Sequence, residues 1–453
     1  MRHHESNDAF LLTMISRRTM LKLAVGSFAG IGVSAPSIVA RCYVNDLSGF
    51  VADRSDAAAA EANRHAISSA LAAGIRTLYI RPGTRFAIDR RLDLPSGAAL
   101  VGEGTGEGRP VIVMPAGLFT HRSLDADQRY SPAAVGIMVT GEQAGEASRD
   151  VRILNLDLRC ERRDARVLRG VLARNAIDLE ISDVHVSGLP VGVAFCLASV
   201  RGNSRVSRCR AHDCRSDMNW GRGAHPQITG LEIDNDRVAG IGTRDLLVEN
   251  FRAEDLTVGP AFAAAHGWET DGINICATEA VHNRFRTILV RNVGEGIDTF
   301  GCDSLFEGIV AENCRIFGLK CVHGASRNLF DRPVIRDAGL AAITVQGSDR
   351  RGDSVGNRFV SPRITGIDPE GRWAASNTAA ILISDNGGRT GLPRDTLVTD
   401  AAIDAGPRGK TAWLDTSHGS GNRGRALRFM GQATEQRTAL IQHGGGSADF
   451  VHP

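Results

Sequence analysis

Two short segments of the chain combine acidic side chains with glycine. The first is Glu269-Thr270-Asp271-Gly272, and the second is Glu295-Gly296-Ile297-Asp298. Hydrolysis of a glycosidic bond needs one protonated carboxyl group, which donates to the leaving oxygen, and one carboxylate, which activates water or attacks the sugar carbon. Carboxyl groups that lie close together repel one another when charged, which raises the pKa of one of them as a general acid requires. The two segments therefore predict acid and base chemistry, provided that the fold brings them together.

The elements that carry these segments are expected to be short strands with one shared pattern. When the segments are aligned, four apolar residues take equivalent positions and are expected to face inward: Ile273, Ile297, Leu319 and Ile343. Side chains alternate along a strand, so the next residue of each strand faces outward. The predicted outward column consists of Asn274, Asp298, Lys320 and Thr344.

Further polar and aromatic residues flank this predicted column. Two tryptophans lie in unusually long intervals between strands, where indole rings can stack on sugars, although packing of these intervals against the fold explains them equally well. The candidate catalytic residues are Asp271, Asp298, Glu295, Glu269 and His323. The candidate substrate-binding residues are Lys320, Asn274, Trp268, Trp220, Gln346 and Arg350.

A loose repeat runs through the chain beyond residue 150. A small polar residue followed two positions later by Phe recurs at intervals of 21, 24 and 29 residues, a period typical of solenoids. The apolar segments of three to five residues, separated by Asn, Asp and Gly, are shorter than the roughly ten to twelve residues that a helix needs. Short strands stacked in parallel are therefore expected. The phenylalanines expected to form an internal column are Phe285, Phe306, Phe330 and Phe359. The residues expected to form hydrogen-bonded turns along the axis, without any chemical role, are Asn283, Asn328 and Asn357.

The N-terminal part carries two further signals. Ser16-Arg17-Arg18-Thr19-Met20-Leu21-Lys22, followed by an apolar stretch, resembles the twin-arginine export motif, which implies a signal peptide and a periplasmic or secreted protein. Residues 55–74 combine a helix entry signal, good helix formers and a terminating Gly, which predicts one amphipathic helix. The expected organisation is a signal peptide at 1–40, a solenoid domain at 41–405 and a C-terminal tail or end cap at 406–453.

Composition and charge narrow the class of partner. Lys and Arg total 53 against 51 Asp and Glu, and the formal net charge is +2, which gives no electrostatic reason to expect nucleic acid or a membrane surface. The 51 glycines and 5% aromatic content fit tight turns between short strands. The nine cysteines form no CxxC pair, so no metal site is predicted and most cysteines are expected to be small buried residues. A polysaccharide is the expected partner, without stable membrane insertion.

The segment after the predicted helix resembles the N-terminal cap of the pectate-lyase-like superfamily. The resemblance rests on Pro82-Gly83-Thr84, Leu94-Pro95-Ser96-Gly97 and Gly102-Glu103-Gly104. It implies an all-β fold, a right-handed parallel β-helix with an N-terminal capping α-helix. A cap is expected because the terminal coil otherwise exposes its apolar interior and its unpaired strand edges.

Within that superfamily, Glu269-Thr270-Asp271-Gly272 is similar to the Asn-Thr-Asp-Gly motif of polygalacturonase-like glycoside hydrolases. Asp298 matches their second acidic motif in part, and His323-Gly324 matches their histidine segment. Glu269 replaces their Asn, and no Arg-x-Lys follows His323, with Arg350-Arg351 as a loose substitute. The resemblance implies a glycoside hydrolase in which Asp271 and Asp298 are the acid and base.

Two other functions stay open at this point. Glu295-Gly296-Ile297-Asp298 is similar to the Tyr-Gly-Phe-Asp segment of alginate epimerases, and Lys320 and His323 could serve as carboxylate binder and base in a uronate lyase or epimerase. A lyase would bring Ca²⁺ as the expected cofactor, whereas no cofactor is predicted for a hydrolase. A non-catalytic polysaccharide-binding surface protein is the third hypothesis. Lys320 stacked on Asp298 can equally be a plain surface ion pair.

Overall fold

The structure is a computed structural model that describes residues 41–114, 135–141, 145–161, 169–217, 227–236, 239–268, 270–348, 352–374, 377–385, 391–406, 411–429, 438–441 and 446–451. The predicted signal peptide at residues 1–40 lies outside these ranges. The site candidates Trp220, Glu269 and Arg350 also lie outside them. No helix within these ranges is long and apolar enough to cross a membrane.

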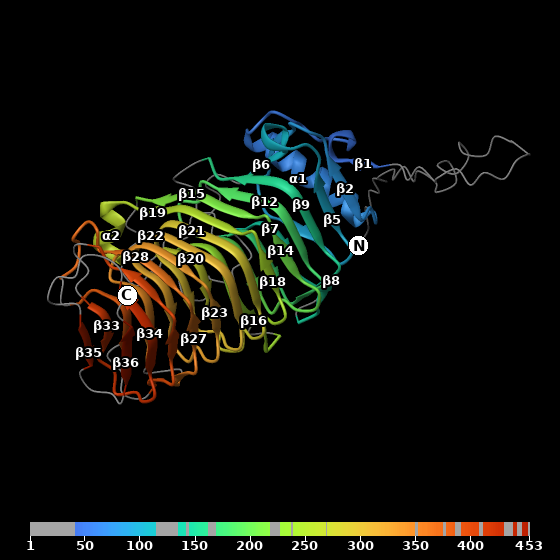
Figure 1. Ribbon diagram of the computed structural model, residues 1–453. Helices are drawn as coiled ribbons and strands as arrows, with labels where there is room; N and C mark the ends of the chain where they lie inside the picture. Colours follow the sequence, from blue (N-terminus) through green and yellow to red (C-terminus); the bar gives the residue numbers. More distant parts are fainter. Residues whose placement is uncertain are drawn as a thin grey trace, which may run out of the picture. The chain divides into compact units, whose positions relative to one another are not determined.

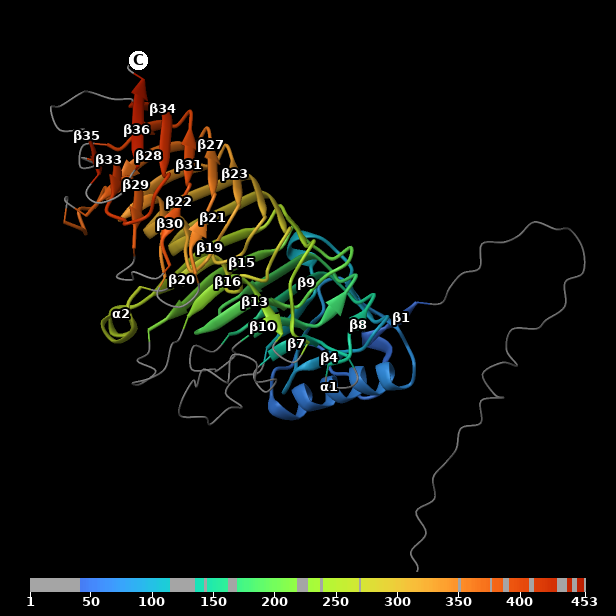
Figure 2. The ribbon, with the colours of Figure 1, turned by 90° about the horizontal axis from the view of Figure 1, so that it is seen from below.

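Short parallel strands stack coil upon coil through residues 41–451 (Figure 1). Counted over the described ranges, 32 strands join one hydrogen-bonded sheet, and all its pairings between successive coils are parallel. Figure 2 shows the same strands from below, with each coil lying directly beside the next. The prediction of a parallel β-solenoid is confirmed.

Each coil contributes strands to three stacks, which we call faces A, B and C. Face A contains β4 (Leu92–Leu94), β7 (Val135–Val139), β10 (Arg169–Arg174), β13 (Gly192–Ala198), β16 (Ile228–Asp236), β20 (Thr270–Ile275), the ends of β21 (Arg284–Thr299) and β22 (Leu305–Cys321), β25 (Ala341–Gln346), β29 (Ala379–Ser384), β33 (Thr411–Asp415) and β35 (Thr438–Ile441). Face B contains β1 (Cys42–Tyr43), β2 (Thr77–Ile80), β5 (Ala99–Gly102), the starts of β9 (Arg152–Arg159), β12 (Glu180–Ser187), β21, β22 and β34 (Arg423–Phe429), and also β14 (Arg205–Ser207), β18 (Leu247–Glu249), β23 (Leu329–Asp331), β27 (Arg358–Val360), β31 (Leu397–Thr399) and the first part of β36 (Ser447–Val451). Face C contains β3 (Arg85–Ala87), β6 (Val111–Val113), β15 (Arg210–Ser216), β19 (Arg252–Val258), β24 (Val334–Ala338), β28 (Arg363–Ile367), β32 (Ala402–Asp404) and the remaining parts of the long strands.

A few short elements lie outside these faces. They are the pairs β8 (Ser148–Arg149) with β11 (Ala176–Ile177) and β26 (Ser354–Val355) with β30 (Pro393–Arg394), then β17 (Ile241–Gly242), the 3₁₀ turns η1 (Val44–Asp46) and η2 (Gly106–Gly108), and the helices α1 (Ala57–Ala72) and α2 (Pro260–His266).

Residues with left-handed backbone turn the chain from one face to the next. Between faces B and C, one such residue recurs at the same point of successive coils, with φ between +48° and +58°: Asn155, Asp183, Arg208, Asn250 and Thr287. Between faces C and A, the equivalent residues in the same φ range are Asp213, Asp255, Asn292, Asn313 and Asp337. Asn and Asp tolerate this conformation better than other residues with a side chain, which explains why they dominate the second corner.

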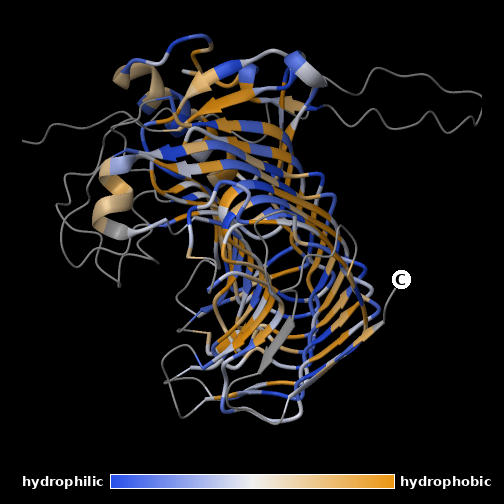
Figure 3. Cartoon of the chain, turned by 60° about the vertical axis from the view of Figure 1, so that its left-hand side comes forward, coloured by the Kyte–Doolittle hydropathy of each residue, from blue (hydrophilic) through white to orange (hydrophobic). Residues whose placement is uncertain are grey.

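The interior is apolar and continuous from coil to coil. Apolar and polar residues alternate along many strands (Figure 3). The predicted phenylalanine column is confirmed, because the four rings stack with centroid distances of 4.5, 4.2 and 4.7 Å: Phe285, Phe306, Phe330 and Phe359. The three asparagines predicted to lie in turns are buried: Asn283, Asn328 and Asn357. They form hydrogen bonds between successive coils, and Asn357 Oδ1, for example, accepts from the Asn328 backbone N–H at 3.2 Å.

The predicted N-terminal helix forms as α1, slightly shorter than expected. Asp56 caps its first turn by accepting a hydrogen bond from the Ala59 N–H at 3.0 Å. Its apolar side, which includes Ile67 and Leu71, is buried in the core that the coils share. Asn63 is fully buried, and its Nδ2 donates to the Ala87 carbonyl oxygen at 3.1 Å. The helix is therefore held against the first coils, and its role as a cap stays a prediction.

Strands continue beyond residue 405, where a tail or end cap was expected. β33 pairs in parallel with β29 of face A, and β34 pairs with both β31 and β32. The nine cysteines are all free thiols, and every one except Cys42 is buried. This agrees with the expectation that most of them are small residues of the interior.

Candidate active site

The predicted outward column on face A is confirmed by the strand register. Asn274 lies opposite Asp298, Asp298 opposite Lys320, and Lys320 opposite Thr344. The four apolar residues predicted to face inward are completely buried: Ile273, Ile297, Leu319 and Ile343. The column also extends toward the N-terminus, because Glu232 lies opposite Asn274.

Three carboxyl groups and one ammonium group meet on this face, and we call Asp271, Glu295, Asp298 and Lys320 the carboxyl cluster. Lys320 Nζ donates to Glu295 Oε2 at 2.9 Å and to Asp298 Oδ2 at 3.1 Å. Asp271 lies opposite Glu295 on the neighbouring coil. Its Oδ2 accepts hydrogen bonds from Asn274 Nδ2 at 2.8 Å and from Gln227 Nε2 at 3.0 Å.

Burial shapes the ionisation of the cluster. Asp271 is 2% exposed, and the side chains of Lys320, Glu295 and Asp298 are 15%, 10% and 8% exposed. Burial first, and then the charges of Glu295 and Asp298, raise the pKa of Asp271 well above its usual value. Burial raises the pKa of Glu295 to about 7, with Lys320 opposing the rise. Burial alone would lower the pKa of Lys320. The attraction of Asp298 and Glu295 outweighs this effect and raises the pKa above its ordinary value, so the ammonium stays charged.

The glycines of the two acidic segments have a packing role. A Cβ at Gly272 would stand 2.6 Å from the Gly296 carbonyl oxygen, and a Cβ at Gly296 would stand 2.3 Å from that of Gly318. Contacts this short do not occur, so only glycine fits where these backbones approach one another. The Asp-Gly pairing that resembles a catalytic motif therefore has a structural cause in this chain.

Two predicted site residues lie farther along the same strands. His323 follows Lys320 by three residues, with φ of 56°, and its Nδ1 lies 2.7 Å from Ser348 Oγ. Its ring also meets the edge of Phe300. Gln346 ends β25 and is 8% exposed. His323 thus lies just after β22, and Gln346 lies at the end of β25, both on face A.

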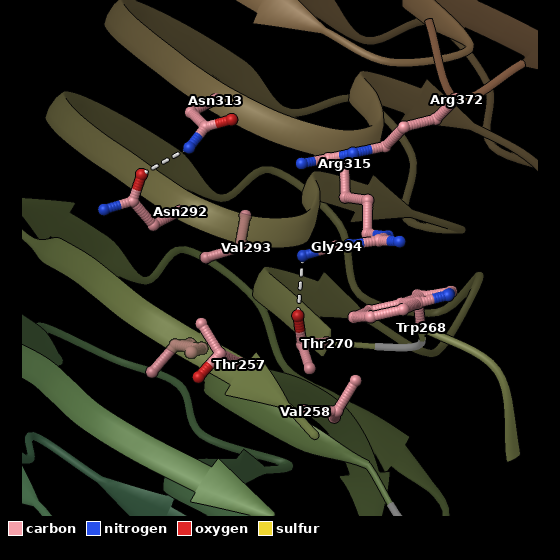
Figure 4. A pocket seen from close by; sticks show the side chains of 11 residues that line it. Thr257, Val258, Trp268, Thr270, Asn292, Val293, Gly294, Asn313, Arg315 and Arg372 are labelled. Carbon is pink, nitrogen blue, oxygen red and sulfur yellow. Dashed lines mark hydrogen bonds between the residues drawn. The ribbon is translucent and has the colours of Figure 1, made fainter. Parts of the chain in front are cut away.

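Trp268 lines a separate pocket of about 130 Å³ beside the cluster (Figure 4). The pocket lies at the corner where face C passes into face A. The Arg315 guanidinium lies over the Trp268 ring, 3.0 Å from its centroid. Thr270 and Gly294 also line the pocket, and they directly precede the cluster carboxylates in the sequence.

Several residues of this region were not predicted. Gln227 and Glu232 belong to the coil of β16, which was hidden inside a long interval of the repeat. The signal that could have revealed this coil is Thr229-Gly230-Leu231-Glu232, which has the same order of small, apolar and polar residues as Glu295-Gly296-Ile297-Asp298. Arg315 and Arg372 come from different coils and share no local motif.

Among the residues that the structure describes, no group of three or more His, Cys, Asp and Glu side chains is arranged to hold a metal ion. The Lys320 ammonium lies between two of the cluster carboxylates. It supplies there the positive charge that a cation would otherwise bring.

Comparison with known proteins identifies the fold. No protein-family model and no curated protein matches the sequence. The chain is similar in structure to the Streptococcus pneumoniae surface protein and adhesin PfbA, with 13% identity and a TM-score of 0.50 over 91% of this chain and 100% of that chain. It also matches the catalytic unit of a GH87 α-1,3-glucanase from Streptomyces thermodiastaticus, with 14% identity and a TM-score of 0.49 over 92% and 71%. A third match is the A-module of mannuronan C-5 epimerase AlgE4 from Azotobacter vinelandii, with 15% identity and a TM-score of 0.47 over 91% and 97%.

At these identities the likeness speaks for the fold alone. It agrees with the parallel β-helix that the resemblance to the pectate-lyase-like superfamily implied.

Proposed function

We propose that the protein is a glycoside hydrolase that cleaves a polysaccharide at the carboxyl cluster. The observation that carries the proposal is the meeting of three nearly buried carboxyl groups with one ammonium group on an outer face of the solenoid. Glycoside hydrolysis uses two carboxyl groups in different protonation states, and neighbours with different surroundings provide them.

The roles follow from the contacts of each group. Asp271 has a raised pKa and accepts hydrogen bonds from the neutral amides of Gln227 and Asn274, which suits it to act as the protonated general acid. Asp298 is paired with Lys320, which suits it to act as the carboxylate base. Glu295 lies between them, bonded to Lys320 and opposite Asp271, and tunes both groups through its charge.

The charge of the cluster favours hydrolysis over elimination. A lyase or epimerase must neutralise the carboxylate of a uronate beside its base. Lys320 already donates to two carboxylates, and with Asp271 protonated the cluster carries up to one net negative charge, when Glu295 is ionised. A uronate carboxylate placed there would be repelled. The sugar at the cleaved bond is therefore expected to be neutral.

The test is an assay of the mature protein against neutral and acidic polysaccharides. New reducing ends without ultraviolet absorbance of unsaturated sugars indicate hydrolysis, whereas both signals together indicate elimination. Asp271→Asn and Asp298→Asn are each expected to lower kcat by about 10³, because positioned acid and base groups contribute roughly 10²–10⁴. Asp303→Asn, which breaks an exposed pair with Arg327, is the matched control. Unchanged cleavage in Asp298→Asn would refute the assignment, and binding without cleavage would support an adhesive role.

The stereochemistry of the product separates two possible carboxyl pairs. Asp271 and Glu295 lie directly opposite each other on adjacent coils, about 5 Å apart at their backbones. They are the candidate pair for a retaining reaction, in which the second carboxylate attacks the sugar carbon. Asp298 lies three residues beyond Glu295 on the same strand, and Asp271 with Asp298 is the candidate pair for an inverting reaction, in which the second carboxylate activates water. Inversion of the anomeric configuration, measured by NMR during the first turnovers, is the outcome expected for Asp298 as base.

We also propose export of the protein through residues 1–40, on the strength of the twin-arginine-like motif alone. Replacement of Arg17 and Arg18 by Lys is expected to retain the protein in the cytoplasm, measured by cell fractionation. Equal amounts outside the cytoplasm in both strains would refute the proposal.

A further inference from the structure

The pocket beside the carboxyl cluster differs from the cluster in the sign of its charge. Its charged lining residues are Arg315 and Arg372, and none of its described lining residues is acidic. The pocket is lined on one side by the end of β19 and the middle of β21, and on the other side by Trp268 (Figure 4). The cationic pocket and the anionic cluster thus lie next to each other and share strands β20, β21 and β22.

The two arginines are held in different ways. Arg315 is half-buried and its guanidinium stacks on Trp268, a contact that fixes its plane. Over the described ranges, no carboxylate lies within ion-pair distance of Arg315, whereas Arg372 pairs with Glu370 at the rim. Burial and the nearby charge of Arg372 lower the pKa of Arg315. A second guanidinium beside a half-buried one is unfavourable unless an anion lies near both. Glu370, paired with Arg372, offsets part of this repulsion, and an anionic ligand in the pocket would offset more of it.

Three polar side chains of the pocket wall take part in hydrogen bonds within the protein: Asn292, Asn313 and Thr270. Asn313 Nδ2 donates to Asn292 Oδ1 at 2.8 Å, and Asn292 Nδ2 donates to Asp255 Oδ1 at 2.6 Å. Thr270 Oγ1 accepts from the Gly294 N–H at 2.6 Å. These side chains therefore shape the walls, and the guanidinium groups of Arg315 and Arg372 are the charged donors of the pocket.

We propose that this pocket is a subsite for the anionic substituent of a sugar adjacent to the cleaved bond, with Arg315 and Arg372 binding a carboxylate or a sulfate. The inference rests on the proposed function and deepens it, because it names the substrate class as a polysaccharide in which an acidic sugar neighbours a neutral one. Guanidinium groups bind planar or tetrahedral oxyanions through paired N–H donors. The volume of about 130 Å³ equals that of roughly four water molecules at ~30 Å³ each, which accommodates such a group.

The position of the pocket sets the order of the sugars. Thr270 precedes Asp271 and Gly294 precedes Glu295, so the pocket wall and the cluster are consecutive in two neighbouring strands. A chain bound with its neutral unit over the cluster places the next unit at the corner where Arg315 lies. Specificity for the acidic unit then comes from the pocket, and the chemistry comes from the cluster.

The first test measures anion binding without turnover. Sodium D-glucuronate, sodium sulfate and D-glucose are titrated into the mature protein while tryptophan fluorescence is recorded, and Trp268→Phe identifies the reporting residue. We expect one or both anions, but not glucose, to change the signal. Arg315→Gln and the rim variant Arg372→Gln are each expected to weaken binding at least tenfold. Arg332→Gln, which removes an exposed guanidinium paired with Asp331 elsewhere on the solenoid, is the matched control and leaves binding unchanged.

The two anions distinguish a carboxylated from a sulfated substrate. Absence of anion binding in the wild-type protein, or wild-type affinity in both pocket variants, would overturn the subsite. A second test compares hydrolysis of an acidic heteropolysaccharide with that of its carboxyl-reduced form, where Arg315→Gln should raise KM only for the acidic form and leave kcat unchanged. Because the titration needs no catalysis, its failure is separate from failure of the hydrolase proposal.

Discussion

The outward column of face A has a polar middle section with an apolar section on each side. In the early coils its residues are Met138 and Leu172, and in the late coils they are Leu382 and Leu414. In the coils between, the same strand position holds Glu232, Asn274, Asp298, Lys320 and Thr344. Both apolar sections pack into small hydrophobic clusters of their own. The backbone register is the same throughout, so the two kinds of section differ only in side chains.

The apolar sections show that the fold itself needs no polar group at this strand position. Burial of charged groups costs free energy that a hydrophobic replacement avoids, and buried ion pairs are often neutral or unfavourable for stability. These sections show that leucine and methionine fit the column. We infer that the polar middle section serves the reaction and that stability is lost in exchange.

The largest expected effect comes from removing the one cation of the middle section. Lys320→Met leaves Glu295 and Asp298 buried without their partner, which is expected to lower the free energy of unfolding by about 3–5 kcal/mol near pH 8. The triple variant Glu295→Gln, Asp298→Leu and Lys320→Leu copies the apolar sections and is expected to regain most of that loss. Chemical denaturation measures both. A triple variant as unstable as Lys320→Met would contradict the inference that apolar residues fit the middle section.

The next effect is the dependence of stability on pH. The folded pKa of Glu295 is about 7 and its ordinary value is 4.5. Between these values the folded state binds more protons than the unfolded state, so stability is full at low pH and falls as pH rises to about 7. The loss amounts to about 3 kcal/mol at 1.36 kcal/mol per unit, and the raised pKa of Asp271 acts in the same direction.

The variant that isolates this effect is Glu295→Gln, which cannot ionise. Its unfolding free energy is expected to change less between pH 5 and pH 8 than that of the wild-type protein. Leu382→Gln in the apolar section is the control and should keep the wild-type pH dependence. Identical pH profiles for the wild-type protein and Glu295→Gln would contradict the assignment of the raised pKa.

A smaller effect concerns the feature that both sections share. Gly136 belongs to the apolar section and Gly296 to the polar one, and a Cβ at either would stand 2.7 or 2.3 Å from the carbonyl oxygen of the next coil. Both alanine substitutions are expected to cost about 2 kcal/mol, within the range of overpacking. Gly108→Ala, where the Cβ meets nothing within 4 Å, is the control. A cost in only one section would show that the two scaffolds are not equivalent.

The smallest effect lies at the boundary between the sections. Thr344 is completely buried, and its Oγ1 has no hydrogen-bond partner among the described residues. Thr344→Val keeps the shape and removes the unsatisfied hydroxyl, so we expect a gain of up to about 1 kcal/mol in thermal or chemical unfolding. Destabilisation by this substitution would show that the hydroxyl has a partner in the folded protein.

Periodic features of the fold were predictable from the sequence. The stacked rings of Phe306 and Phe330 follow from the repeat, because a β-helix places equivalent residues one coil apart. The alignment of Asn274, Asp298 and Lys320 follows from the alternation of side chains within those coils. Local rules of this kind need no knowledge of the loops.

Features that depend on irregular segments were not predictable. Arg372 reaches the pocket from the segment after β28, and nothing in its neighbourhood indicates Arg315 as its neighbour. Gln227 bonds to Asp271 from a coil whose pattern was masked by an insertion. The motif Asp271-Gly272 was predicted for its chemistry, whereas the glycine is explained by the carbonyl oxygen of Gly296 in the next coil. In a short motif of a solenoid, one residue can thus be present for its chemistry and its neighbour for close packing between coils.

The recurrence of left-handed residues at the same corner of every coil has a consequence for how such a chain changes in length. Because Asn250 and Thr287 are equivalent points one turn apart, the segment from one to the other is a complete unit that begins and ends in the same backbone conformation. Duplication or deletion of such a unit would leave the strand pairing of the remaining turns unchanged. Whole turns could therefore be added to or removed from the solenoid along its axis while the polar middle section keeps its arrangement.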